Sequence, residues 1–179
     1  ATKTVPVTMD AAKSYAFERT WGTNTTTQDT EGEITASSDV RPSEAQILTA
    51  LPQFIGVINQ VPPKFSAIKI DGKRAYDLAR AGETVEIKPR EVRVDDFRLI
   101  NVTPETATFA VDCGKGTYIR SLARDLAATL DTCGHVTVLR RTRVGPFTLQ
   151  QAITLAELEE TCDRGAVSEA LYPLSTALD

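Results

Sequence analysis

The stretch from Cys113 to Arg143 constrains the fold more than any other part of the chain. Thr117 is a suitable helix cap, because its hydroxyl can accept a hydrogen bond from the free amides of a first helical turn. Tyr118 and Arg120 then lie where an extended segment becomes a helix, a place from which side chains can reach a ligand while the scaffold stays rigid. A glycine-flanked lysine, Gly114-Lys115-Gly116, precedes this junction. Apolar residues at helical spacing follow it: Ile119, Leu122, Leu126 and Leu130.

The remaining periodicity predicts an α+β fold with a largely antiparallel sheet flanked by helices. Strands are expected over 13–21, 65–70, 91–102, 106–113 and near 136–147, and they follow one another in hairpin-like pairs. Helices are expected over 43–54, 75–81, 117–131 and 155–162, the first of them capped by Ser43 and burying Ile47, Leu48 and Leu51. The polar run 22–39 suggests a mobile loop, and Asp71-Gly72 indicates a tight turn.

Length and composition indicate one domain without a metal or cofactor. A chain of 179 residues can bury a substantial core. Its three cysteines are widely spaced and it has one histidine, so neither a disulfide framework nor a structural zinc site is indicated. No apolar run approaches the ~20 residues of a membrane helix, and no signal peptide pattern is present. We therefore expect a cytoplasmic protein with no membrane contact.

The charge distribution favours a nucleic-acid partner more than the total charge does. The formal net charge is −4, which by itself argues against RNA binding. Residues 64–93, however, carry eight basic and five acidic side chains, and residues 115–143 carry six basic and two acidic ones. Local positive charge is what phosphate contacts require, because these interactions decay within a Debye length. The alternative is chance segregation of charge on solvated faces.

Several motifs resemble the bacterial tRNA pseudouridine synthase B family. Lys13-Ser14-Tyr15 is similar to its Lys-x-Tyr motif, and the blocks 61–69 with 72–82, 113–126 and 135–141 match further family blocks in the same order. The resemblance implies a pseudouridine synthase-like fold. It also implies that residues 1–179 are a partial catalytic domain, with 165–179 leading toward an absent C-terminal RNA-binding domain.

The resemblance also implies an activity and a set of site residues. Members isomerise a T-loop uridine of tRNA by flipping the base out of its stack, without a cofactor. Tyr15 would stack on the base and handle a proton, Arg120 would pair with the catalytic aspartate, and Tyr118 and Leu139 would line the uridine pocket. Each has a plainer alternative: core packing for the two tyrosines and Leu139, and a surface position for Arg120.

A second set of residues is expected to track the RNA backbone of the tRNA T-arm. Basic side chains around a predicted hairpin and in the later basic segment suit phosphate contacts: Lys64, Lys69, Lys73, Arg74 and Arg141. Arg140 and Arg143 are further candidates. We expect the full-length protein to be monomeric.

The catalytic aspartate of the family lies in a Gly-x-Leu-Asp motif, and no such motif occurs in these 179 residues. We therefore expect Arg120 to lack its partner, and the chain alone to be inactive and to bind tRNA weakly. Asp125 is a poor substitute, because it lies inside an amphipathic helix beside Arg124. Thr26, Asn24 and Val138 differ from the residues common in the family at these positions. These differences do not affect Tyr15, Tyr118, Arg120 or Leu139.

Two other functions compete with this one. A non-catalytic RNA-binding module is what the chain would be if no aspartate were supplied. A nucleotide-binding enzyme is suggested by Gly114-Lys115-Gly116-Thr117, but a phosphate-binding loop needs glycine where Phe109 stands, and serine or threonine where Gly116 follows the lysine.

Overall fold

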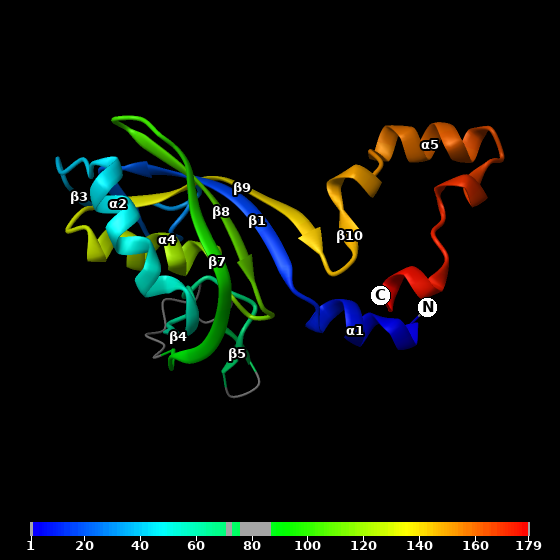
Figure 1. Cartoon of the computed structure of the whole chain (residues 1–179), viewed down its shortest axis with the longest axis horizontal. Helices are drawn as coiled ribbons and strands as arrows, with labels where there is room; N and C mark the ends of the chain where they lie inside the picture. Colours follow the sequence, from blue (N-terminus) through cyan, green and yellow to red (C-terminus); the bar gives the residue numbers. More distant parts are fainter. Residues whose placement is uncertain (1, 71–72, 76–86, 179) are drawn as a thin grey trace.

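The computed structural model describes residues 2–70, 73–75 and 87–178, and its centre is a six-stranded antiparallel sheet (Figure 1). The strand order is β10-β9-β1-β8-β7-β4. The strands are β1 Lys13–Trp21, β4 Gly56–Gln60, β7 Arg90–Val102, β8 Thr106–Cys113, β9 Gly134–Val144 and β10 Phe147–Thr148. Two small hairpins accompany the sheet, β2 Thr23–Thr25 with β3 Ile34–Ser37 and β5 Lys69–Ile70 with β6 Lys73–Arg74. The predicted α+β class is confirmed.

The helices begin where the sequence provides caps. Ser43 caps α2, as predicted, and it does so in a capping box with Gln46. The cap of α4 is Tyr118, not Thr117, whose hydroxyl instead donates to the Gly114 carbonyl at 3.1 Å. The α-helices are α1 Val5–Asp10, α2 Glu44–Ala50, α4 Ile119–Thr129 and α5 Leu155–Asp163. The 3₁₀ turns are η1 Thr2–Thr4, η2 Leu51–Phe54, η3 Leu149–Gln151, η4 Val167–Ala170 and η5 Leu174–Ala177.

The core lies on one face of the sheet. Every second residue of β8 is buried, and α2 and α4 cover that face together. Phe17 and Phe109 stack with their ring centroids 5.1 Å apart, and burial of each ring contributes roughly 1.5–3 kcal/mol. The predicted apolar face of α4 is confirmed by its buried residues, which include Ile119, Leu122 and Leu126. One core therefore joins the sheet to the helix that carries Arg120.

Three local predictions are wrong, and two lie outside the described residues. Residues 22–39 are not simply a loop, because they contain the β2–β3 hairpin. Leu48 is exposed, whereas Ile47 and Leu51 are buried as predicted. The predicted strand 65–70 is reduced to Lys69–Ile70, and β4 was not foreseen. The turn Asp71-Gly72 lies outside the described residues, as does nearly all of the predicted helix 75–81.

The C-terminal part of the chain extends away from the sheet. Figure 1 shows α5 beyond the end of β9, on the side opposite α2, and α5 buries none of its residues. Thr154 caps α5, and hydrogen bonds from its backbone and hydroxyl lower the pKa of the Glu157 carboxyl. Within the described ranges, no helix is long and apolar enough to cross a membrane.

Candidate active site

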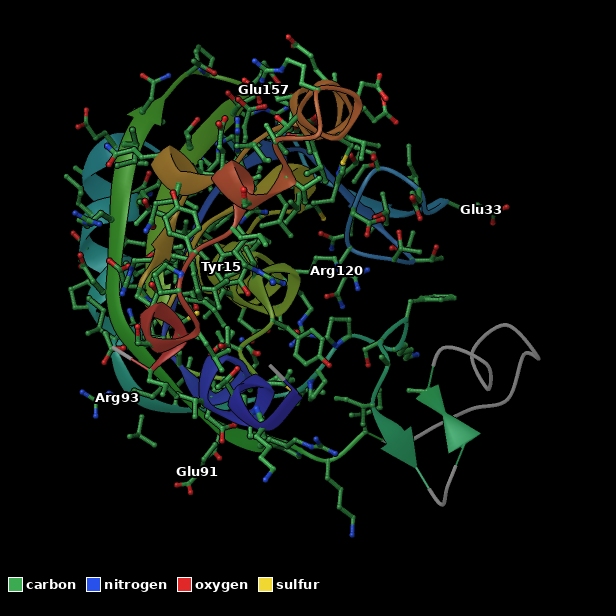
Figure 2. All side chains as sticks on the ribbon, turned by 90° about the vertical axis from the view of Figure 1, so that its right-hand side faces the viewer. Tyr15, Glu33, Glu91, Arg93, Arg120 and Glu157 are labelled. Carbon is green, nitrogen blue, oxygen red and sulfur yellow. The ribbon has the colours of Figure 1, made fainter. Side chains whose placement is uncertain are left out.

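Arg120 connects three segments at the start of α4. Its Nη1 donates to the Asp29 carboxylate at 2.8 Å and to the Thr27 carbonyl at 2.9 Å, and its Nη2 donates to the Phe65 carbonyl at 2.8 Å. The expectation that Arg120 lacks a partner is therefore wrong: Asp29 supplies the carboxylate, and the arginine is not left as an unpaired cation. Figure 2 places Arg120 toward the interior, whereas Glu33 points outward.

Asp29 is fixed by its own loop. Its Oδ1 accepts hydrogen bonds from the Thr27 hydroxyl and from the Glu31 amide, which leaves Oδ2 for Arg120. The loop is anchored to the sheet, because the Val136 amide donates to the Gln28 carbonyl at 3.1 Å. The Arg120–Asp29 pair is about three-quarters buried, with side-chain exposures of 22% and 26%. A charge-assisted bond in such a place is stronger than a surface ion pair.

A pocket of about 470 Å³ opens beside this ion pair. Its walls come from the β2–β3 loop, from Phe65, from Arg120 and from β9. Thr137 is the extra residue of a bulge in β9, since Glu18 pairs with Val138 and Arg19 with Val136. The bulge lets Val136, Thr137 and Leu139 all line the pocket, as bulges near functional sites often do. The volume is in the range of ligand pockets, about 300–1,000 Å³.

Tyr15 lies on the same sheet face as Leu139. Tyr15 is directly opposite Arg141, and Phe17 is opposite Leu139, so the four side chains share one face of the antiparallel pair. The Arg141 guanidinium lies over the Tyr15 ring, 5.6 Å from its centroid. The structure thus brings Arg120 and Leu139 together in the pocket. Tyr15 lies farther along the same face of the sheet, outside the pocket lining. Neither Tyr15 nor Tyr118 is among the described residues that line the pocket.

Lys13 adds positive charge near Tyr15. Its ammonium donates to the carbonyls of Met9 and Ala11 at 2.7 and 2.6 Å, at the end of α1. Burial lowers the pKa of Lys13, and the nearby Arg141 guanidinium lowers it further. Two cationic groups therefore lie at the Tyr15 end of β1, a suitable environment for a phosphate.

The predicted RNA-binding residues are spread over two regions. Lys64 is exposed beside the pocket residue Phe65, and Arg141 is exposed on β9. Lys69 pairs with Arg74 through the backbone of the β5–β6 hairpin, which also contains Lys73. The side chains of these three lie outside what the structure describes, so their contribution stays a prediction.

Other polar residues have ordinary structural contacts. Asp125 forms an ion pair with Arg124 at 2.7 Å, as expected. The ring Nδ1–H of His135 donates to the Thr23 carbonyl at 2.9 Å and ties β9 to the β2–β3 hairpin. Over the part of the chain that the structure covers, no three His, Cys, Asp or Glu residues are grouped closely enough to hold a metal ion.

Sequence reasoning missed Asp29, Phe65 and Gln60 as parts of this site. Asp29 lies in the polar run 22–39, whose composition suggests a mobile loop, although threonines before it and Gly32 after it are typical of a structured turn. Gln60, buried at 1% exposure, bonds to the backbone of Tyr118. No periodic signal marks such a residue, since its partner is 58 positions away.

Two family models together match the whole chain. The sequence model described as TruB family pseudouridylate synthase (N terminal domain) matches residues 1–119, and the model described as tRNA pseudouridylate synthase B C-terminal domain matches residues 120–179. The boundary between them falls in the first turn of α4, whose residues belong to the same core as the sheet.

Relatives and solved structures match the chain over nearly its full length. It is 53% identical to tRNA pseudouridine synthase B of Caulobacter vibrioides, with 100% of this chain and 58% of the relative covered. The protein of the same name from Bradyrhizobium diazoefficiens is 51% identical, with 100% and 54% covered. The crystal structure of a Cbf5-Nop10-Gar1 complex is similar with a TM-score of 0.72 and 25% identity, over 99% of this chain and 46% of that one. The chain thus spans somewhat more than half the length of these curated relatives.

Proposed function

Because the chain belongs to the TruB family of pseudouridylate synthases, we propose that it forms the body of a tRNA pseudouridine synthase that isomerises a T-loop uridine. The observation that carries this proposal is the pocket that is lined both by Arg120, fixed by Asp29, and by the β9 residue Leu139. The proposed partner is the T-arm of tRNA. The proposed enzyme is a cytoplasmic monomer that uses no cofactor or metal.

The reaction exchanges one glycosidic bond for another. The bond between uracil N1 and the ribose C1′ breaks, a bond between C5 and C1′ forms, the C5 proton is released and N1 gains a proton. The base must leave its stack first, so the enzyme needs an aromatic face and a closed pocket. In the proposed arrangement Tyr15 offers that face and handles a proton, and Tyr118 and Leu139 contact the bound uridine. Of these two, only Leu139 lines the pocket in the free protein, so Tyr118 is proposed to contact the base from the start of α4.

Arg120 is proposed to keep a nucleophilic carboxylate ionised. A guanidinium stabilises the charged form of a nearby carboxylate and can form two parallel hydrogen bonds with it. Asp29 and the carbonyls of Thr27 and Phe65 hold the guanidinium in place beforehand. We propose that the nucleophile is an aspartate outside these 179 residues, because they contain no Gly-x-Leu-Asp sequence.

The RNA contacts of the proposed enzyme follow the basic residues. Lys64, Lys69, Lys73, Arg74 and Arg141 are proposed to contact phosphates of the T-arm. Support comes from the exposed positions of Lys64, next to the pocket residue Phe65, and of Arg141, over the Tyr15 ring.

Tritium release from tRNA labelled at uridine C5 tests the function. We expect release by a form extended at its N-terminus with a Gly-x-Leu-Asp motif, and none by the 179-residue chain. Release by the 179-residue chain alone would mean that an aspartate within it is the nucleophile. No release by either form would refute the proposed activity.

Replacement of Tyr15 by phenylalanine separates an enzyme from a non-catalytic RNA-binding module. In the N-terminally extended form, loss of the hydroxyl in Tyr15→Phe should lower turnover by about a hundredfold or more, the usual contribution of a positioned proton donor or acceptor, and should leave tRNA affinity nearly unchanged. Tyr172→Phe, on an exposed tyrosine of the C-terminal part, is the matched control. Equal losses of binding and turnover in Tyr15→Phe would favour the module.

A further inference from the structure

Gln60 makes an unusual pair of hydrogen bonds to the residue at which α4 begins. The Tyr118 amide donates to Gln60 Oε1 at 2.8 Å, and Gln60 Nε2 donates to the Tyr118 carbonyl at 3.1 Å. Gln60 is the last residue of β4 and is 1% exposed. Its carboxamide therefore acts as a peptide group would, exchanging two bonds with one residue as in an antiparallel ladder.

These bonds hold the two peptide groups on either side of the Tyr118 Cα, where the chain turns from extended to helical. Tyr118 is the N-cap of α4 with φ −102° and ψ 115°, and its side chain makes no capping bond. Its carbonyl also accepts the first helical hydrogen bond, from Leu122 at 3.1 Å. Because side chains follow the backbone that carries them, we infer that these two peptide groups set the directions of the Tyr118 and Arg120 side chains.

The segment after Gln60 continues the attachment. The Val61 carbonyl accepts from the Ser121 hydroxyl at 2.8 Å and from Arg124 Nη2 at 3.0 Å. The Phe65 carbonyl accepts from Arg120, as described above. Pro62 and Pro63 are buried between these points, and consecutive prolines hold the backbone extended. Residues 60–65 thus form a stiff strap across the first two turns of α4.

We propose that Gln60 is a positioning residue for the pocket: its carboxamide sets the orientation of the helix start that presents Tyr118 and Arg120. Gln60 itself lies outside the lining of the pocket, so it acts through the Tyr118 peptide and the strap. This inference rests on the proposed function for its effect on turnover, whereas its geometric part does not. A displacement of about 1 Å in a positioned group can lower turnover by about a hundredfold.

Hydrogen exchange of the Tyr118 amide tests the geometric part in the 179-residue chain. Gln60→Met keeps the length of the side chain and removes both hydrogen bonds, so exchange at Tyr118 should become at least about tenfold faster. Gln53→Met, on an exposed glutamine of η2, is the matched control and should leave that rate unchanged. Unchanged exchange in Gln60→Met would overturn the proposal, whatever the activity of the protein.

Gln60→Glu tests the functional part in the N-terminally extended form. A protonated carboxyl group can donate to the Tyr118 carbonyl and accept from its amide, but a carboxylate can only accept. Burial raises the pKa of such a carboxyl, so this variant should approach wild-type turnover at about pH 5.5. By about pH 8 its kcat should fall at least tenfold below wild type, with KM for tRNA within about threefold.

The two experiments have separate outcomes. A Gln60→Glu variant whose kcat follows wild type across the pH range, or whose loss lies in KM, would overturn the positioning role. A wild-type extended form without tritium release would refute the proposed function, and Tyr118 exchange would still decide whether Gln60 holds the helix start.

Discussion

At the scale of single residues, two arginines show how partners decide the cost of burial. Arg120 satisfies its guanidinium with a carboxylate and two carbonyls. Arg19 is fully buried, donates to the Ala123 carbonyl at 2.9 Å and lies 4.0 Å from the centre of the Trp21 ring. Its Nε and Nη2 have no hydrogen-bond partner among the described residues. Burial lowers the pKa of Arg19 to about 9, so the cation is destabilising at neutral pH.

Replacing Arg19 by methionine should stabilise the protein. Removing a buried cation with unsatisfied donors should outweigh the lost contact with Trp21, so Arg19→Met should raise the free energy of unfolding by about 1 kcal/mol. Thermal unfolding measures this, as a rise of roughly 2–4 °C. Arg140→Met, on an exposed arginine of β9, is the control and should change little. A clear loss of stability in Arg19→Met would contradict this account.

The same comparison predicts a pH dependence. The folded-state pKa of about 9 lies below the ordinary value of 12.5, so between these values the unfolded chain binds more protons than the folded one. Stability then rises with pH in that window. The difference in the free energy of unfolding between Arg19→Met and wild type, measured by thermal unfolding over a pH series, should therefore be full below about pH 9 and shrink above it.

At the scale of elements, the β2–β3 loop is a tightly built turn. The Thr25 hydroxyl donates to the Asp29 carbonyl at 2.6 Å, and the Thr26 amide donates to the Glu33 carbonyl at 2.9 Å. A Cβ on Gly32 would lie 2.5 Å from the Thr27 hydroxyl and 2.6 Å from the Thr27 amide nitrogen. The position thus admits only glycine without movement of the segment that presents Asp29.

Gly32→Ala should displace the loop and with it the Arg120–Asp29 pair. Overpacking against backbone should lower the free energy of unfolding by about 1–3 kcal/mol. In the N-terminally extended form, the fractional loss of turnover should exceed the fractional loss of stability. Thermal unfolding and tritium release measure the two effects. Gly114→Ala is the control, since its nearest contact would be an ordinary 3.6 Å. Unchanged stability and turnover in Gly32→Ala would show that the loop can yield.

At the scale of the whole molecule, an acidic protein presents a local basic region near its pocket. The formal net charge is −4, so binding to RNA must depend on short-range contacts. Arg141 forms no ion pair with any carboxylate in the described ranges, and it is exposed beside Tyr15. Arg93, by contrast, pairs with Asp95 and points outward at the edge of the molecule in Figure 2.

The salt dependence of tRNA affinity should report the Arg141 contact. Arg141→Gln should weaken binding and make the slope of log K against log salt shallower by about one, because one phosphate contact is lost. Filter retention over a salt series measures the slope. Arg93→Gln is the matched control, with no expected change of slope. Equal slopes for wild type and Arg141→Gln would remove Arg141 from the interface.

Elements that rest on local signals could be predicted from the amino-acid sequence. The strand 13–21 and the strands near 91–113 follow from alternation, because one face of each is buried. The apolar stripe of α4 and the Ser43 cap of α2 were equally readable, since their partners lie within a few residues. The motifs around Tyr15 and Arg120 pointed to the family that the comparisons show.

How the site is completed depends on contacts between segments that are far apart in the chain. The partner of Arg120 is Asp29, 91 positions away, and the partner of Tyr118 is Gln60, 58 positions away. Such pairs depend on how the hairpin and β4 pack around the start of α4, which no local pattern encodes. A buried polar group must find a partner, but the sequence does not say which one. The large separation of the partners along the chain therefore prevented their prediction from the sequence, although the chemistry of each residue was known.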